Sequence, residues 1–247
     1  TGEYDFIVLV GSEALQHFTK ERSITEHCGR LINDKFIPVI NPGMLAFKPE
    51  ARETWEDALN KLKKYISGEL TSVKIDEDKF YGITDTAEAL AWVKAARASI
   101  SPKIAVDTET TGLYPRDGYI LGISMSVDED TAVYISTDCI DEEITSEMQE
   151  LFREKSVIMH NAKFDLAMLE YHFNFEFPNI DDTMLMSYML NEVPGNHGLK
   201  SLAIKHTPYG DYEKPMYDFI DEYCRRNNLL KGQFTWDMIP FELMQVY

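Results

Sequence analysis

Two acidic residues, Asp107 and Glu109, stand near the end of an apolar run at residues 103–110, and Gly112 follows shortly after. This pattern is typical of a buried strand, in which side chains two positions apart point to the same face. The two carboxylates would then project together, about 7 Å apart along the strand. Carboxylates held side by side repel unless a cation separates them, and the usual cation is a divalent metal. Taken alone, however, Asp-x-Glu is more often a pair of solvated acids at a strand end.

A second segment combines Asn161 with Asp165 where a short apolar run passes into a helical pattern. Because these residues are four positions apart, we expect them on one helical face near the N-terminus of the helix. The helix dipole favours an acid there whatever its role, so a capping role for Asp165 stays open. Combined with the Asp-x-Glu strand, the pair indicates a cluster of carboxylates that bind metal.

The elements around these residues are those of a mixed α/β sheet. The turn signal at residues 128–130 predicts a hairpin, so the Asp-x-Glu strand would begin a three-stranded meander. Asp85 and Glu88 form a capping box before an Ala-rich helix. We expect strands at residues 103–110, 119–127, 131–136 and 157–159, and helices at residues 87–98, at about 146–155 and from 161 onward.

In combination these segments resemble the 3′-5′ exonuclease domain of family A DNA polymerases, within the four-carboxylate exonuclease superfamily. Residues 107–113 resemble its first motif and residues 160–165 its second, and residues 182–191 and 197–203 resemble the helices that follow. The resemblance extends over residues 78–247. It implies an α/β, ribonuclease H-like domain with a mixed sheet and flanking helices. It also implies hydrolysis of the 3′-terminal phosphodiester of single-stranded or frayed DNA.

The third motif of that family is Tyr-x-x-x-Asp, and two places in the chain compete for it. Tyr217 and Asp221 have the right spacing, but they lie in an acidic stretch that comes early. The segment 234–247 better resembles the family's lead-in, with Pro240 starting a helix and Tyr247 as the motif's tyrosine. The matching Asp would lie four residues further on, so we expect the sequence to contain three of the four carboxylates.

The resemblance also implies roles for these residues. Two Mg²⁺ or Mn²⁺ ions would activate the attacking water and stabilise the leaving oxygen of the phosphodiester. Asp107 would bridge the two ions, Glu109 and Asp165 would complete their shells, and Tyr247 would orient the water.

Three further residues of the motifs are expected near the substrate. Asn161 would position neighbouring groups or DNA, and Thr108 lies between the two strand carboxylates. Leu113 is a candidate wedge against the terminal base, although ordinary packing explains a leucine there equally well. Aromatic side chains also stack on bases, but 13 Tyr and 13 Phe are too many to choose among.

Residues 1–70 resemble the C-terminal half of the uracil-DNA glycosylase fold, and a generic α/β segment explains the same pattern. The likeness lies in residues 11–15, 24–30 and 37–45 and in a helix around residues 55–57. Asn41 stands where that family has a His, and the half of the fold that activates water is absent. We therefore expect a structural or DNA-positioning role, in a unit separate from residues 78–247.

Charge and composition restrict the partners. With 24 basic and 42 acidic side chains the net charge is −18, which opposes nonspecific binding to nucleic acid. Either the acidic side chains hold metals that bridge to phosphate, or the main DNA-binding surface lies on a part of the protein outside this chain. The latter fits a fragment, since the chain lacks an initiator Met and stops within a helical pattern. We expect a C-terminal polymerase domain in the parent chain, which resembles a phage protein.

The cysteines and the apolar runs indicate the compartment. Three scattered cysteines without Cys-x-x-Cys suit a reducing cytosol, either bacterial or of an infected bacterial host. No apolar run approaches the ~20 residues of a membrane helix, so we expect no membrane partner.

Three functions compete at this point. The first is an active proofreading exonuclease, which the intact Asp107, Glu109 and Asp165 favour. The second is a degenerate exonuclease fold that only positions DNA for a polymerase. The third is a glycosylase, which Asn41 disfavours.

Overall fold

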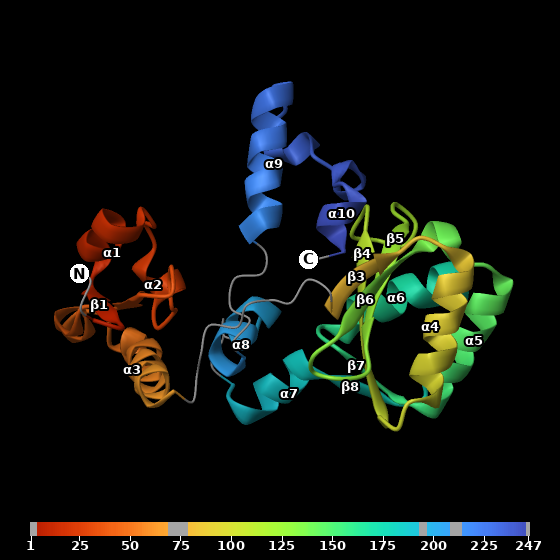
Figure 1. Cartoon of the computed structure of the whole chain (residues 1–247), viewed down its shortest axis with the longest axis horizontal. Coiled ribbons are helices and arrows are strands. Elements are labelled where there is room, and N and C mark those ends of the chain that lie inside the picture. Colours follow the sequence, from red (N-terminus) through yellow and green to blue (C-terminus); the bar gives the residue numbers. More distant parts are fainter. Residues whose placement is uncertain (1–3, 69–78, 193–196, 208–213, 246–247) are drawn as a thin grey trace. The chain divides into compact units, whose positions relative to one another are not determined.

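The computed structural model describes residues 4–68, 79–192, 197–207 and 214–245 (Figure 1). The chain divides into two compact units, one of residues 1–75 with 200–211 and one of residues 76–199 with 212–247. Among the described residues, no helix combines the length and the apolar character needed to cross a bilayer.

The first unit is built on two parallel strands, β1 (Ile7–Val10) and β2 (Phe36–Val39), in which Ile7 pairs with Phe36. Leu15, Ile37 and Ile40 are fully buried between these strands and the surrounding helices. The helical elements of this unit are α1 (Ser12–Thr19), α2 (Ile24–His27), η1 (Pro42–Ala46), η2 (Pro49–Ala51) and α3 (Arg52–Ser67). Its second segment contains α8 (Leu199–His206), except for the first residue of that helix. The helix expected around residues 55–57 is present as part of α3.

Asn41 has a local structural role. Its Oδ1 accepts a hydrogen bond of 2.9 Å from the backbone N–H of Gly43, which caps η1. The side chain is thus engaged in the turn that ends the second strand. The likeness of this unit to a uracil-DNA glycosylase stays a prediction.

The second unit contains a six-stranded mixed sheet in the order β3-β6-β5-β4-β7-β8. The pairs β4–β5 and β5–β6 are antiparallel, which is the predicted meander, and the other neighbouring pairs are parallel. The mixed sheet confirms the expected fold class. Its strands are β3 (Phe80–Ile83), β4 (Lys103–Thr110), β5 (Ile120–Ser126), β6 (Ala132–Ser136), β7 (Ser156–Met159) and β8 (Ile180–Asp182).

Helices α4 (Thr86–Ala98) and α5 (Glu142–Glu154) lie together against one face of this sheet (Figure 1). Arg97 on α4 joins the two helices through ion pairs with Glu147 and Glu154. Asp85 caps α4 as expected, accepting from Glu88 N at 3.0 Å. The other helices of this unit are α6 (Ala162–Phe173), α7 (Thr183–Leu190), α9 (Lys214–Asn227) and α10 (Phe241–Met244). The short 3-10 helix η4 (Thr137–Cys139) precedes α5, and η5 (Lys231–Gln233) and η6 (Trp236–Met238) lie between α9 and α10.

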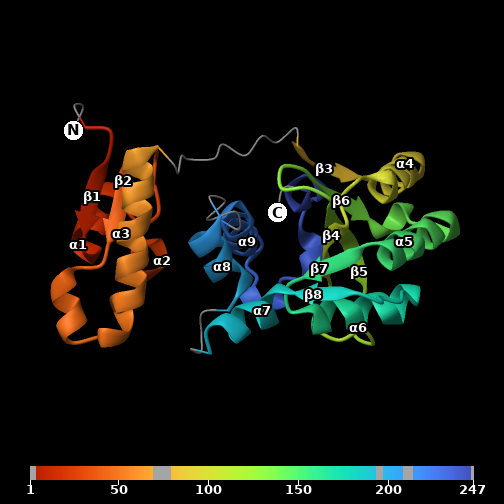
Figure 2. The ribbon, with the colours of Figure 1, turned by 90° about the horizontal axis from the view of Figure 1, so that it is seen from below.

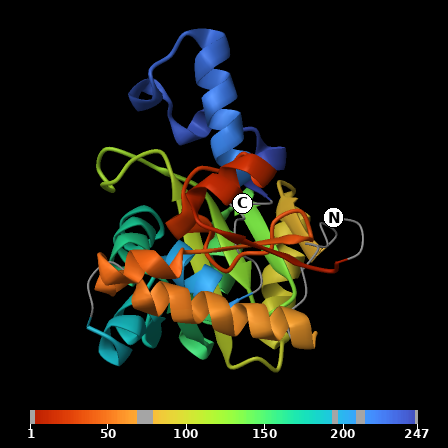
Figure 3. The ribbon, with the colours of Figure 1, turned by 90° about the vertical axis from the view of Figure 1, so that its left-hand side faces the viewer.

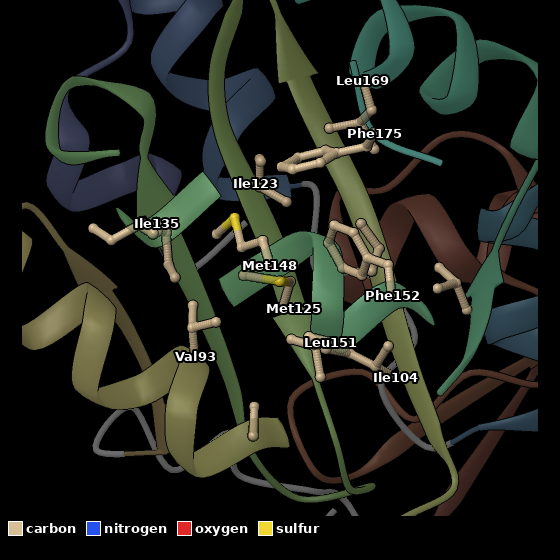
Figure 4. Close-up of a cluster of buried hydrophobic side chains, with 14 of the residues drawn as sticks. Val93, Ile104, Ile123, Met125, Ile135, Met148, Leu151, Phe152, Leu169 and Phe175 are labelled. Carbon is tan, nitrogen blue, oxygen red and sulfur yellow. The ribbon is translucent and has the colours of Figure 1, made fainter. Parts of the chain in front are cut away.

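The main core lies between the sheet and α4, α5 and α6. Val93, Ile104, Met148, Phe152 and other apolar side chains interlock there, as Figure 4 shows. The alternation along β4 sends residues 104, 106 and 108 into this core. Because side chains alternate across a strand, Asp107 and Glu109 point to the opposite face of the sheet.

Two strands were missed by the sequence-based expectations. No strand was expected at residues 80–83 or 180–182, where β3 and β8 form. Both strands are short and lie at the edges of the sheet, where pairing depends on a neighbour distant in the sequence. Helix α5 also begins earlier than expected, at Glu142, because Asp141 caps it by accepting from Ile144 N.

Phe152 tests the core. Its ring is fully buried and contacts the rings of Phe175 and Phe177 at centroid distances of 5.2 and 5.1 Å. Phe152→Ala should lower the free energy of unfolding by about 3–5 kcal/mol, because it removes buried area and leaves a cavity. Chemical denaturation followed by circular dichroism measures this change.

Ile100 provides the matched control, since its side chain is fully exposed. Ile100→Ala should change the free energy of unfolding by less than ~0.5 kcal/mol. Equal effects of the two substitutions would contradict the assignment of the core.

Candidate active site

Asp107 and Glu109 project from the last part of β4, across from Ser124 and Gly122 of β5. They occupy the sheet face opposite the main core, two positions apart as predicted. Glu109 is half-buried, and Asp107 keeps solvent access although protein surrounds much of its carboxylate. The pairing register shifts directly after Glu109, before the last pair of Thr110 with Ile120.

Asp165 reaches the same region from the first turn of α6. Strand β4 pairs with β7 only as far as Ala105, so the backbone beyond that point has no strand partner on this side. Asp165 Oδ1 takes the vacant place and accepts from Thr108 N at 3.0 Å and from Thr108 Oγ1 at 2.7 Å. Both residues are buried, at 2% and 6% exposure. The Thr108 hydroxyl is therefore committed to Asp165 rather than directed toward a substrate.

The start of α6 is fixed by Asp182 at the end of β8. The Asp182 carboxylate accepts from the backbone N–H groups of Asn161 and Ala162, and also from those of Met184 and Leu185. One carboxylate thus caps both α6 and α7, and Figure 2 shows α6 beside β7 and β8. No sequence signal identified Asp182, because its two helices are separated by a strand.

The expected position of Asn161 differs from the observed one. Asn161 has φ 61° and ψ 47°, so it lies in the left-handed region just before α6 and not on a face of the helix. Asn tolerates this conformation better than most residues. The side chain is exposed beside the site, and its expected contact with substrate stays a prediction.

All three carboxylates have raised pKa values, and burial is the largest cause of each shift. Burial raises the pKa of Glu109 to about 8, with the charges of Asp107 and Asp165 adding to it. Burial and the charge of Asp165 raise the pKa of Asp107 to about 7. Burial raises the pKa of Asp165 to about 6, while the hydrogen bonds from Thr108 oppose the shift. No basic side chain contributes to any of these three shifts.

This environment fits a divalent metal. The donors are carboxylate oxygens, which hard cations such as Mg²⁺ prefer, and their raised pKa values express a deficit of positive charge. Within the described ranges, no three acidic, His or Cys side chains already close around one point. The donor chemistry therefore fits, while closure around an ion requires movement of these side chains or a further ligand.

Tyr134 covers the neighbouring part of this sheet face. Its ring lies over Gly122, where a Cβ would collide with it, and Gly122 is the strand partner of Glu109. The Tyr134 side chain is 4% exposed and packs against Phe241 of α10 at a centroid distance of 5.7 Å. The C-terminal segment thus docks on the face that carries the carboxylates.

The two candidates for the third motif differ in what can be said of them. Gln245 Oε1 accepts from Gly82 N at 3.0 Å, which fixes the chain two residues before Tyr247. Tyr247 itself lies outside the described residues. Asp221 is exposed on α9, and Tyr217 is exposed on the same helix.

Leu113 is 77% exposed in the loop that follows β4. It therefore contributes little to the core, and its expected role as a wedge against a base stays a prediction.

Comparisons with known proteins identify relatives of this chain. A family model described as a 3′-5′ exonuclease matches residues 80–231. The DNA polymerase of Escherichia phage T5 is 35% identical, over 99% of this chain and 30% of that polymerase. DNA polymerase I of Rhizobium leguminosarum is 26% identical, over 60% of this chain and 17% of that protein. The chain thus spans less than a third of the length of either relative, and the likeness to the phage protein includes the N-terminal unit.

Solved structures show more distant likeness. Escherichia coli RNase D has a TM-score of 0.44 and 20% identity, over 51% of this chain and 33% of its own. The Nibbler EXO domain of Aedes aegypti has a TM-score of 0.46 and 13% identity, over 54% of this chain and 71% of its own.

The raised pKa values of Asp107 and Glu109 predict a stability that depends on pH. Since the folded protein holds these protons to higher pH than the unfolded chain, their contribution is fully present below about pH 4. It is lost as pH rises through the folded pKa values of about 7 and 8. Without divalent metal, Asp107→Asn should therefore melt at a higher temperature than wild type at pH 8.5, and the gap should narrow toward pH 5.

Calorimetry in EDTA measures this difference. Asp130→Asn, which changes an exposed acid in the β5–β6 turn, should melt like wild type at both pH values. A difference in melting temperature between Asp107→Asn and wild type that does not depend on pH would contradict the raised pKa of Asp107.

Asp182 predicts a second effect on stability. Asp182→Ala leaves N–H groups of two helices without their acceptor, so the free energy of unfolding should fall by about 2–3 kcal/mol. Asp85→Ala removes the acceptor of one N–H at one helix and should cost only about 1 kcal/mol. Urea denaturation of both variants compares them, and equal costs would argue against a shared cap.

Proposed function

Because the chain belongs to the family of 3′-5′ exonuclease domains of family A DNA polymerases, we propose that it removes nucleotides from the 3′ end of single-stranded or frayed DNA. The observation that carries this proposal is that Asp107, Glu109 and Asp165 lie close together. They lie where β4 extends beyond its pairing with β7 and where α6 begins. A cluster of three carboxylates whose pKa values no described basic side chain lowers suits metal-assisted hydrolysis of a phosphodiester.

Exonucleases of this family typically use divalent metals. In this chain Asp107, Glu109 and Asp165 would hold two Mg²⁺ or Mn²⁺ ions. When bound, such ions lower the pKa of the attacking water and neutralise charge on the leaving 3′-oxygen. Held by carboxylates, they also present positive charge to the phosphate, which offsets the acidic balance of the chain locally.

The protein's own groups set the geometry. Thr108 orients Asp165 through two hydrogen bonds to a single oxygen, leaving the other carboxylate oxygen available to a ligand. The alternation of β4 aims Asp107 and Glu109 at the same side. Tyr247 would orient the attacking water, and the docking of α10 beside Tyr134 supports that role because it brings the chain to this face of the sheet.

The parent protein would be a DNA polymerase in which this exonuclease corrects errors. The phage relative supports a following polymerase domain, because this chain covers only 30% of that DNA polymerase. The DNA would then be the primer strand, delivered as a frayed 3′ end. A phage relative also supports action in the cytoplasm of a bacterial host.

Substitution of the strand carboxylates tests this function. Asp107→Ala with Glu109→Ala should reduce the Mg²⁺-dependent release of nucleotides from a single-stranded 3′ end by about 10³-fold or more, because the metals lose their main ligands. Gel analysis of a 5′-labelled oligonucleotide measures the release.

Asp130→Asn is the control and should leave the rate unchanged. A wild-type chain that binds the oligonucleotide but releases nothing with Mg²⁺ or Mn²⁺ would instead favour the degenerate fold that only positions DNA. Release that survives the double substitution would reject the assigned carboxylates.

A further inference from the structure

The loop that follows β4, residues 111–119, is closed at its base by hydrogen bonds between its two ends. The ribbon is seen from another side in Figure 3. Thr111 N donates to Tyr119 O at 3.0 Å, and Tyr119 N donates to Thr111 Oγ1 at 3.0 Å. Gly112 and Gly118 touch where the two arms cross, and a Cβ on Gly118 would lie 2.6 Å from Gly112 N. The loop is therefore a preformed structure and holds its tip in a fixed place.

The tip of this loop and α6 border an open pocket of about 670 Å³. Tyr114, Pro115, Arg116 and Asp117 line it from the loop, and Glu170 and Tyr171 line it from the helix. The Tyr114 and Tyr171 side chains are 67% and 59% exposed. Two large aromatic side chains on opposite sides of one open pocket are thus exposed to solvent. Packing within this unit does not explain their exposure.

The pocket lies close to the carboxylates along both of its walls. Tyr114 is five residues beyond Glu109 on the chain that continues from β4. Tyr171 is six residues beyond Asp165 on α6, which corresponds to about 9 Å of helix. A strand whose 3′ end lies at the carboxylates therefore has its next nucleotides within reach of this pocket.

The charges of the lining favour a base over a phosphate. Arg116 is exposed, and no ion pair involving it occurs among the described residues, but Asp117 and Glu170 line the same pocket. Two acids and one guanidinium disfavour an anion, whereas aromatic faces stack on neutral bases of any sequence. The carboxylates of Asp117 and Glu170 can also accept hydrogen bonds from the exocyclic amino groups of bases.

We propose that the pocket between Tyr114 and Tyr171 holds one nucleobase of the substrate strand, a few nucleotides before its 3′ end. This subsite rests on the proposed function, because only a nucleic acid substrate brings a base to it. It anchors the strand by stacking while the terminal phosphodiester lies at Asp107, Glu109 and Asp165.

Tyr119 supplies a matched control. It belongs to the same loop and is 53% exposed, but its side chain does not line the pocket. Its hydrogen bonds to Thr111 use backbone atoms only, so Tyr119→Ala keeps the base of the loop intact.

The test measures binding of a 5′-fluorescein single-stranded decamer to the 247-residue chain by anisotropy, with Ca²⁺ in place of Mg²⁺ to slow hydrolysis. Tyr114→Ala and Tyr171→Ala should each raise Kd about fivefold or more, the loss expected for one stacked base. Tyr119→Ala should change Kd less than about twofold.

A scan with one abasic nucleotide at each position of the decamer identifies the bound base. Wild type should lose affinity at one position near the 3′ end, and Tyr114→Ala should show no further loss there. Equal Kd values for Tyr114→Ala and wild type, no binding by wild type, or losses at that position that simply add would each overturn the subsite.

Release of nucleotides by wild type with Mg²⁺, measured in parallel, separates this inference from the proposed function. If wild type releases nucleotides while Tyr114→Ala binds normally, only the subsite is rejected. If the subsite binds as described and no nucleotide is released, only the exonuclease function is rejected.

Discussion

The link between Thr108 and Asp165 joins the two halves of the site. Strand β7 stops pairing at Ala105 while β4 continues to Thr110, so a buried N–H would lack an acceptor if Asp165 were absent. A buried backbone donor without a partner is costly, so the fold and the chemistry require the same carboxylate. The site forms where neighbouring strands end at different points, and α6 supplies the missing acceptor.

The same arrangement concentrates negative charge in a partly buried place. Asp107, Glu109 and Asp165 all have raised pKa values, and among the described residues no basic side chain lowers them. Binding sites and active sites often lower the stability of a protein in this way, and the rest of the structure must provide the stability that is lost. Here the supply comes from the interlocked aromatic and aliphatic core behind β4 and from the cap that Asp182 provides to two helices.

Local patterns in the sequence predicted the strand of Asp107, the meander and the helix of Asp165, because alternation, turn residues and caps act over a few positions. The double cap by Asp182 and the left-handed backbone of Asn161 depend on β8 and on the end of β7, which no local pattern reveals. The choice of Tyr114 among 13 tyrosines likewise needed the loop and α6 to be placed in space.

Strand β3 is closed by residues that are synthesised long after it. Gly82 has no room for a side chain because Phe241 lies against it, and its N–H is taken by Gln245, 163 residues later. Contacts between such distant segments form slowly. During translation, β3 cannot make these contacts until residues 241–245 have been synthesised. A ribosome that stalls before residue 241 would therefore leave this edge of the sheet open to pairing with another chain.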